Sequence, residues 1–391
     1  MTNNSVPANS VVITWSEGRS ALCAIRSLGR KRVRTIAISS VPGAMGFYSR
    51  YSAERCLVPS YATDLLHYRD SLFSLSKRSD VLTIMPFTEA DAYVLCTWRD
   101  AFEKHVQPMW VSKETFELVS DRMKLFSLAE SLEIPTPKTR LMSEWDDWSS
   151  PCIIKSRYSI VQRENGLFYG GVRIVDPQKK PDYESTKRSM MHEPLVQEFV
   201  DGDEYGFFAL FNEGRLRAKL QHRRLLSMSY SGGASVLRTT VYNEKLDELG
   251  LRILRALKWH GPAMVEFKFD REEREFKLME INPRFWGSLN LGLCAGVDFP
   301  YLYYQVAKDG DCESILRYKT NVSSHYSLGI ALHLLSVARA RYPTYVRKPP
   351  LLEDIRFIIS ALLDSKSDVS DWRDLAPSFA DLWSTFTLRR T

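Results

Sequence analysis

Short apolar runs alternate with helical stripes along the first third of the chain. Residues 11–14 and 33–38 are short, mostly apolar stretches of the kind that form buried strands. Between them, apolar residues recur at helical spacing over 19–28, which predicts a helix with one packed face. A further apolar run at 81–85 predicts another strand. Because strand–helix–strand units join parallel strands by a right-handed crossover, residues 1–112 are predicted to form an open α/β lobe.

The pattern changes after residue 112 to strand-like alternation. A helical stripe ends at Pro135 and Pro137, which force an extended exit and mark a domain junction. Strand-like segments then dominate, broken by one helix at about 244–258. These segments are 152–155, 171–175, 195–200, 207–211, 216–220, 236–241, 264–270 and 276–282. Residues 113–310 are therefore predicted to form an α+β domain with antiparallel sheets, and 311–391 a helical packing appendage without chemistry of its own.

Composition narrows the class of function. The chain has 391 residues and a formal charge of +6, which suits phosphate or carboxylate ligands, and it has no basic stripe or nucleic-acid module. Its six cysteines are far apart and form no CxxC pair, so we expect reduced thiols in a cytoplasm, with neither a disulfide framework nor a zinc site. There is no apolar run of about 18 residues, so no membrane partner is expected.

The turn after the first predicted strand has no phosphate-binding glycine fingerprint. Glu17 stands there in place of the GxGxxG pattern of dinucleotide-binding folds. A carboxylate at that position would repel a pyrophosphate. A nicotinamide-dependent oxidoreductase is therefore disfavoured.

The most informative stretch is a predicted hairpin rich in acidic residues. Two alternating segments, 264–270 and 276–282, flank a polar connector of residues 271–275. If the turn is centred on this connector, Glu266 and Glu280 face each other across the ladder with their Cβ atoms about 5 Å apart. Opposed carboxylates at that spacing repel each other. A slip of one residue in the register would separate them.

A divalent cation would relieve the repulsion between these carboxylates. Asn282 lies two residues beyond Glu280 and shares its face, so two carboxylates and one amide oxygen form a set that suits Mg²⁺. The alternation also places Glu280 on the face of Phe276 and Leu278, where an unneutralised carboxylate is costly. In the alternative interpretation, the acids point into water and pair with basic neighbours.

The segment Glu280-Ile281-Asn282-Pro283-Arg284 resembles the E-x-N-x-R metal and phosphate signature of the ATP-grasp superfamily, with Glu266 as the upstream carboxylate. Further elements that resemble this family occur upstream in its order. They are Asp121-Arg122 ahead of Ile134–Pro137, Lys155 at the end of an apolar strand, Tyr169-Gly170-Gly171-Val172, and the stretch 195–204. Arg122 stands where most members have lysine, and the glycine loop is poorer in glycine than usual. The resemblance is greatest to carbamoyl phosphate synthetases, biotin carboxylases and uncharacterised carboxylate–amine ligases.

The resemblance implies an ATP-grasp fold over the predicted elements. Residues 1–112 would form the Rossmann-like lobe that precedes the ATP-grasp domain. Residues 113–310 would clamp ATP between a small lobe (113–195) with the glycine loop and a large lobe (196–310) with the metal site. A helical appendage (311–391) would follow.

The resemblance also implies roles for individual residues. ATP and Mg²⁺ (or Mn²⁺) are the expected cofactors, and Arg284 and Arg238 are the expected catalytic residues, which would stabilise charge on the transferred phosphoryl and the carboxylate. The expected metal ligands are Glu266, Glu280 and Asn282. The expected nucleotide-binding residues are Arg122, Lys155, Gly170, Gly171, Gln197, Glu198, Val200 and Glu204. Contacts to the substrate are expected from Ser16, Glu17, Arg19 and Thr88 in the first lobe.

The implied reaction is ATP-dependent ligation. A carboxylate, for example that of an amino acid, would be activated as an acyl phosphate and joined to an amine or thiol, with release of ADP and phosphate. The partners would be small molecules, with a homodimer allowed by the family resemblance. Two alternatives stay open: a nucleotide-binding regulator without turnover, and an enzyme that phosphorylates bicarbonate as biotin carboxylase does.

Overall fold

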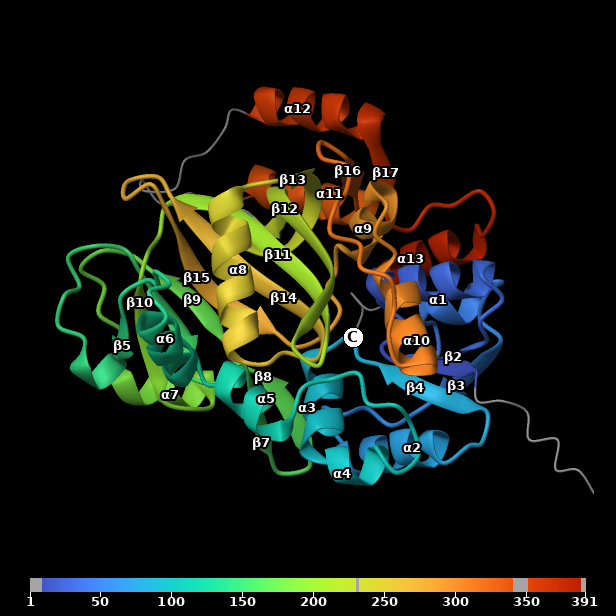
Figure 1. Ribbon diagram of the computed structural model, residues 1–391. Coiled ribbons are helices and arrows are strands. Elements are labelled where there is room, and N and C mark those ends of the chain that lie inside the picture. The colour runs from blue at the N-terminus through green and yellow to red at the C-terminus, as the bar shows by residue number, and fades with distance from the viewer. Residues whose placement is uncertain (1–8, 230–231, 340–350, 388–391) are drawn as a thin grey trace, which may run out of the picture.

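In the computed structural model, which describes residues 9–229, 232–339 and 351–387, the chain opens with a four-stranded parallel sheet (Figure 1). Strand β1 (Ser10–Ile13) pairs in parallel with β2 (Thr35–Ser39), and α1 (Arg19–Arg30) connects them. The sheet order is β3-β2-β1-β4. The other elements of this lobe are η1 (Met45–Tyr48), β3 (Glu54–Leu57), α2 (Leu65–Ser76), β4 (Val81–Met85), α3 (Glu89–Thr97) and α4 (Arg99–Phe102). The predicted α/β lobe is confirmed.

A smaller antiparallel sheet follows two connecting helices. Its order is β5-β10-β6-β9, and its faces bury a separate apolar cluster that includes Met142, Trp145 and Ile154. A two-stranded hairpin, β7–β8, is inserted between β6 and β9. The elements of this part are α5 (Lys113–Ser120), α6 (Arg122–Ser131), β5 (Thr139–Leu141), η2 (Met142–Glu144), β6 (Cys152–Ser156), β7 (Ile160–Arg163), β8 (Gly166–Tyr169), β9 (Val172–Val175), α7 (Tyr183–Met190) and β10 (Pro194–Glu198).

The largest sheet has seven strands in the order β15-β14-β11-β12-β13-β16-β17. Helix α8 covers one face of β11 and β14 (Figure 1), and Phe207, Val265 and Ile253 share the apolar core there. Because side chains alternate along a strand, the neighbouring positions point to the opposite face. The elements are β11 (Gly202–Asn212), β12 (Arg215–Ser229), β13 (Gly232–Val241), α8 (Glu244–Ala256), β14 (Gly261–Asp270), β15 (Glu275–Asn282), α9 (Leu289–Ala295) and α10 (Phe299–Asp309).

The C-terminal part contains the predicted helices and also two strands that the pattern did not predict. Strands β16 (Ser323–His325) and β17 (Ser365–Ser367) extend the large sheet beyond β13. Three residues give too short a run for any periodicity to be recognised. The helices are α11 (Ser327–Arg339), α12 (Leu351–Asp364) and α13 (Ala376–Thr387). Within the described ranges, no helix combines the length and apolarity needed to cross a membrane.

The segment after β17 is anchored on the first lobe by a buried carboxylate. Asp374 accepts hydrogen bonds from Arg26 Nε at 2.9 Å, Ser49 Oγ at 2.7 Å and the Arg50 amide at 2.9 Å. The Asp374 and Arg26 side chains are only 1% and 6% exposed. The last part of the chain and the first lobe are therefore held together by a charge pair that water hardly reaches.

This anchor generates a stability prediction. Asp374→Ala leaves the Arg26 guanidinium buried without its counter-ion, which costs about 3–5 kcal/mol in the free energy of unfolding. The matched control is Asp371→Ala, because Asp371 pairs with Arg30 at the surface, where 36% of the arginine side chain is exposed. The control should cost less than about 1 kcal/mol. Urea titrations would measure both changes, and equal losses in the two variants would contradict the prediction.

Candidate active site

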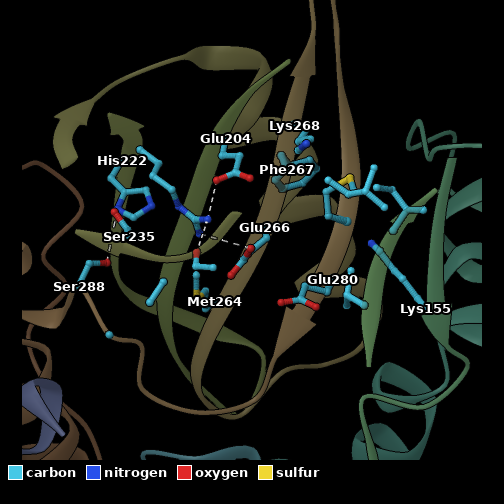
Figure 2. Close-up of a pocket in the computed structure, with 18 of the residues that line it drawn as sticks. Lys155, Glu204, His222, Ser235, Met264, Glu266, Phe267, Lys268, Glu280 and Ser288 are labelled. Carbon is cyan, nitrogen blue, oxygen red and sulfur yellow. Dashed lines mark hydrogen bonds and ion pairs between the residues drawn. The ribbon is translucent and has the colours of Figure 1, made fainter. Parts of the chain in front are cut away.

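A cavity of about 1080 Å³ lies between the small sheet and the face of the large sheet that α8 leaves open (Figure 2). Side chains from eight of the described helices and strands line it, so both lobes contribute to its walls. Representative lining residues are Lys155 from β6, Ile174 from β9, Glu204 from β11, Arg224 from β12, Glu266 from β14 and Glu280 from β15.

The predicted acidic pair is confirmed. Glu266 is the direct cross-strand partner of Glu280. The connector is one residue shorter than predicted, because Asp270 pairs with Glu275 and only residues 271–274 form the turn. An irregularity between Phe267 and Glu266 inserts one extra residue in β15, which restores the predicted register at the acids.

The same bulge corrects the expected orientation of Glu280. Leu278 pairs with Phe267 and both lie in the core with Phe276, whereas Met279 and Glu280 line the cavity. Glu280 therefore does not share a face with Phe276 and Leu278. The prediction was wrong because strict alternation across residues 276–280 leaves no place for an inserted residue.

Protein cations surround the acidic pair. Arg122 Nη2 lies 3.7 Å from Glu280 Oε2, and Arg224 Nη2 lies 3.7 Å from Glu266 Oε2. Asn282 Nδ2 donates to Glu280 Oε1 at 3.1 Å, and Arg284 donates to Asn282 Oδ1 at 3.1 Å. Arginines from neighbouring elements therefore supply part of the charge that neutralises the two acids, as the alternative interpretation of the sequence allowed.

The two carboxylates differ in their affinity for protons. Burial, followed by the charge of Glu280, raises the pKa of Glu266 to about 7. Burial acts in the same direction on Glu280, but Arg122, the Asn282 amide and Lys155 together outweigh it and lower the pKa of Glu280. Glu280 is therefore the carboxylate that stays ionised, and Glu266 is the one that a further cation would ionise.

The donor set fits a hard divalent cation. Glu266 and Glu280 keep 26% and 35% of their side-chain surfaces open. Asn282 Oδ1 accepts one hydrogen bond and retains a second lone pair. Among the described residues, no three Asp, Glu, His or Cys side chains are grouped for metal binding. Two carboxylates suit Mg²⁺, which commonly keeps waters and takes phosphate oxygens as its other ligands.

Two of the predicted phosphate-binding cations lie beside the acids. Lys155 lines the cavity across from Glu280 (Figure 2), and burial followed by the charge of Arg122 lowers the pKa of Lys155 to about 8. Arg122 is buried, donates to the Ser156 carbonyl at 2.8 Å and keeps Nε without a partner among the described residues. Lys268 also lines the cavity, and the sequence interpretation did not assign it to the nucleotide.

Four nucleotide-binding residues were expected within 195–204, and Glu204 is the one of them that lines the cavity. There it pairs with Arg224. Gln197 is buried and donates to Thr139 at 2.9 Å, while Glu198 pairs with Lys277 at 2.9 Å. The Val200 side chain is also buried. The main-chain carbonyl of Val200 accepts a hydrogen bond from the cavity-lining Lys268 at 3.3 Å. A nucleotide would therefore meet Glu204 and Lys268 rather than the side chains of these three residues.

Gly170 and Gly171 link β8 to β9 and do not line the cavity. The Gly170 amide already donates to the Ser159 carbonyl at 3.0 Å. A Cβ atom at Gly170 would lie 2.5 Å from the Tyr158 carbonyl oxygen, and one at Gly171 would lie 2.9 Å from Met190 Sδ. In this structure the glycines allow close packing at the base of the hairpin, and their contact with a phosphate stays a prediction.

The two predicted catalytic arginines have different environments. Arg284 lines the cavity and contacts Asn282. Arg238 is fully buried, does not line the cavity and pairs with Asp368 of the C-terminal part. Arg238 is therefore not at the cavity surface in this structure, and its role in stabilising charge on the phosphoryl and the carboxylate stays a prediction. Nothing in the sequence around Asp368 indicated this pairing, because the two residues lie far apart in the chain.

Of the four first-lobe residues expected to contact the substrate, one lies at the cavity. Arg19 lines the cavity. Ser16 is buried, and Glu17 faces a separate small pocket where it accepts a hydrogen bond from Ser39. The Thr88 hydroxyl is used to cap α3. His222 and Ser288 complete the cavity end near Arg19, with Ser288 Oγ 3.4 Å from His222 Nδ1.

Comparisons with known proteins agree with this architecture. Residues 190–327 match the family described as ATP-grasp in the biosynthetic pathway with Ter operon. The biotin carboxylase domain of Hydrogenobacter thermophilus 2-oxoglutarate carboxylase superposes with a TM-score of 0.63 at 14% identity, covering 81% of this chain and 73% of that one. The chain has the ATP-grasp fold.

Two further similarities agree with this fold. An L-amino acid ligase from Bacillus licheniformis superposes on this chain with a TM-score of 0.59 at 15% identity, covering 81% of this chain and 79% of that one. The carbamoyl phosphate synthase large chain of Methanothermobacter thermautotrophicus is 22% identical over 189 residues, or 44% of this chain. That match spans only 18% of the length of the curated relative.

The raised pKa of Glu266 predicts how stability depends on pH. The folded protein holds this proton more tightly than the unfolded chain, so wild-type stability falls as pH rises from about 4.5 towards about 7. The Glu266→Gln variant has no ionisable group at this position, so its stability does not show this decrease. The melting temperature of the variant minus that of the wild type, measured without nucleotide or metal, should therefore increase between about pH 5 and about pH 8. A constant or decreasing difference would contradict the assignment.

Proposed function

We propose that this ATP-grasp protein is an ATP-dependent ligase that activates a carboxylate as an acyl phosphate and joins it to an amine. The observation that carries the proposal is the Glu266–Glu280 pair inside a cavity with Lys155 and Arg284. A carboxylate pair ringed by cations at the meeting of two lobes suits a magnesium-bound polyphosphate.

The residues fit a division of labour along the cavity. Glu266, Glu280 and Asn282 would hold Mg²⁺, which when bound neutralises charge on the phosphates. Lys155 faces these acids and would contact the phosphates, with Arg122 as a buried supporting charge.

Arg284 is suited to stabilise the reacting groups. It lines the cavity next to Asn282, and its Nε has no partner among the described residues. A guanidinium held at this point would stabilise the negative charge that develops as the phosphoryl moves to the carboxylate. Such preorganised charge is commonly worth about 3–4 kcal/mol of transition-state stabilisation.

The position of the cavity between two lobes suits a water-sensitive product. An acyl phosphate is hydrolysed when water reaches it, so the reaction needs walls from both lobes. The β7–β8 hairpin is bonded to the first lobe: the Leu167 amide donates to the Tyr61 carbonyl at 2.9 Å, and the Leu65 amide donates to the Asn165 carbonyl at 2.7 Å. These bonds connect the small lobe to the first lobe.

The proposal of an amine as the nucleophile is supported by a protein of similar fold. The L-amino acid ligase is named for joining amino acids, and the chain aligns with most of its length. We therefore propose a small acid, such as an amino acid, as donor and an amine as acceptor. Bicarbonate phosphorylation and nucleotide binding without turnover are the outcomes that an assay would have to distinguish.

The test is Glu280→Gln assayed with Mg²⁺-ATP and mixtures of α-amino acids. Loss of the metal-binding carboxylate should lower ADP formation at least about 100-fold and abolish the thermal shift that Mg²⁺-ATP causes. The matched control is Glu272→Gln, because Glu272 is exposed in the turn of the same hairpin.

Three outcomes decide between the candidate functions. Amino-acid-dependent ADP formation with a condensed product in mass spectra supports the ligase, whereas ADP formation that depends on bicarbonate alone supports the second enzyme. Nucleotide binding without ADP release supports the regulator. If Glu280→Gln formed ADP at the wild-type rate, the assignment of Glu280 as a metal ligand would be wrong.

A further inference from the structure

One end of the cavity is formed by five residues that the proposed phosphate chemistry does not use. We call it the Arg19 end, and it consists of Arg19, His222, Ser235, Gly287 and Ser288. His222, Ser235 and Ser288 lie together on the far side of Glu204 and Glu266 from Lys155 (Figure 2). It is therefore the part of the cavity farthest from the proposed nucleotide contacts.

Arg19 is held rigidly at this end. Its Nε donates to the Gly287 carbonyl at 2.9 Å and its Nη2 donates to the Ser235 carbonyl at 2.6 Å. The ring of Tyr326 packs against the guanidinium at 4.7 Å. The first lobe thus contributes a fixed cation to a wall that is otherwise built from the large lobe.

A carboxylate from the C-terminal part stands behind this cation. Asp368 lies 3.5 Å from Arg19 Nη1 and also pairs with Arg238, and its side chain is 1% exposed. The Asp368 amide donates to the His325 carbonyl at 2.8 Å, which fixes the residue beside β16. Two guanidinium groups share this one carboxylate, and Arg19 Nη1 has no hydrogen-bond partner among the described residues.

The Arg19 end contrasts with the acidic centre of the cavity. Its lining contains hydroxyls, a glycine and His222, whose pKa burial lowers well below the usual value, so that the imidazole is neutral. Asp381 lies beyond Tyr326, whose hydroxyl donates to it at 2.9 Å. None of the five residues of this end is an acid, so the charge presented to a ligand is that of Arg19.

We propose that the Arg19 end binds a substrate carboxylate that is not the one activated, and that Asp368 is the positioning residue that holds Arg19 for this task. The inference rests on the proposed ligase function and adds a substrate class to it. The carboxylate belongs either to an amino-acid acceptor or to a dicarboxylic donor. In both cases a guanidinium recognises it through charge-assisted hydrogen bonds.

The test measures binding of matched pairs of compounds by calorimetry in the presence of Mg²⁺ and a non-hydrolysable ATP analogue. One arm compares α-amino acids with their α-amides, and the other compares aliphatic dicarboxylic acids with their half-amides. Wild type should bind the carboxylate member of one arm at least about tenfold more tightly. The arm that shows this preference identifies the source of the carboxylate.

Variants then assign the preference to residues. Arg19→Gln should abolish the preference for the carboxylate compound. Arg19→Lys should retain part of this preference, because lysine keeps the positive charge but lacks the planar pair of N–H donors of the guanidinium. Asp368→Asn should reduce the preference without changing affinity for the ATP analogue, whereas the surface control Asp371→Asn should leave both unchanged. Unchanged affinity for the analogue also shows that a variant is folded.

The outcomes separate this inference from the proposed reaction. No preference in either arm with wild type, or an unchanged preference in Arg19→Gln, overturns the subsite. An Asp368→Asn variant that binds every ligand as wild type does overturns the positioning role. A carboxylate preference that depends on Arg19, in a protein that forms no ADP, would support the subsite while the ligase proposal fails.

Discussion

Two like charges placed opposite each other across a β-ladder need counter-charges, and the site is organised around this requirement. Glu266 and Glu280 are direct cross-strand partners on the open face of the large sheet. The nearest cations come from different parts of the chain: Arg122 from α6, Arg224 from β12 and Lys155 from the small sheet. The small lobe must therefore lie against the large one for the acids to be neutralised. The charge balance of the site therefore depends on how the two lobes pack against each other.

A bulge determines which face of the sheet carries the acids. Without the extra residue at Met279, Glu280 would share the buried face with Phe276 and Leu278. With it, one strand supplies apolar side chains to the core beneath α8 and, two residues later, a carboxylate to the cavity. Bulges commonly redirect side chains next to active sites in this way.

A second group of charges connects the C-terminal part to the first lobe and the large sheet. Asp374 ties the C-terminal part to Arg26, and Asp368 reaches Arg19 and Arg238 from the same part. Each of these carboxylates is almost completely buried, so each pair depends on both partners being present. The C-terminal part therefore belongs to the structural frame of the cavity as much as the strands do.

Local patterns were enough to predict the elements and the core of the site. Apolar runs and stripes indicated the α/β lobe and most strands of the antiparallel sheets, because periodicity reflects which face of an element is buried. The facing of Glu266 and Glu280 was also predictable, since a hairpin brings together residues that are close in sequence. Three-residue strands such as β16 and the inserted residue at Met279 give no periodic signal of this kind.

The sequence by itself determined the fold class, the order of the lobes and the carboxylates at the centre of the cavity. Only the tertiary structure decided that Arg238 is buried against Asp368, that Gly170 and Gly171 pack closely, and which of the four first-lobe candidates lines the cavity. The physical reason is the separation along the chain of the residues that interact. Periodicity and hairpin pairing act over a few residues, whereas a buried ion pair between Arg19 and Asp368 joins segments whose proximity depends on how every intervening element packs.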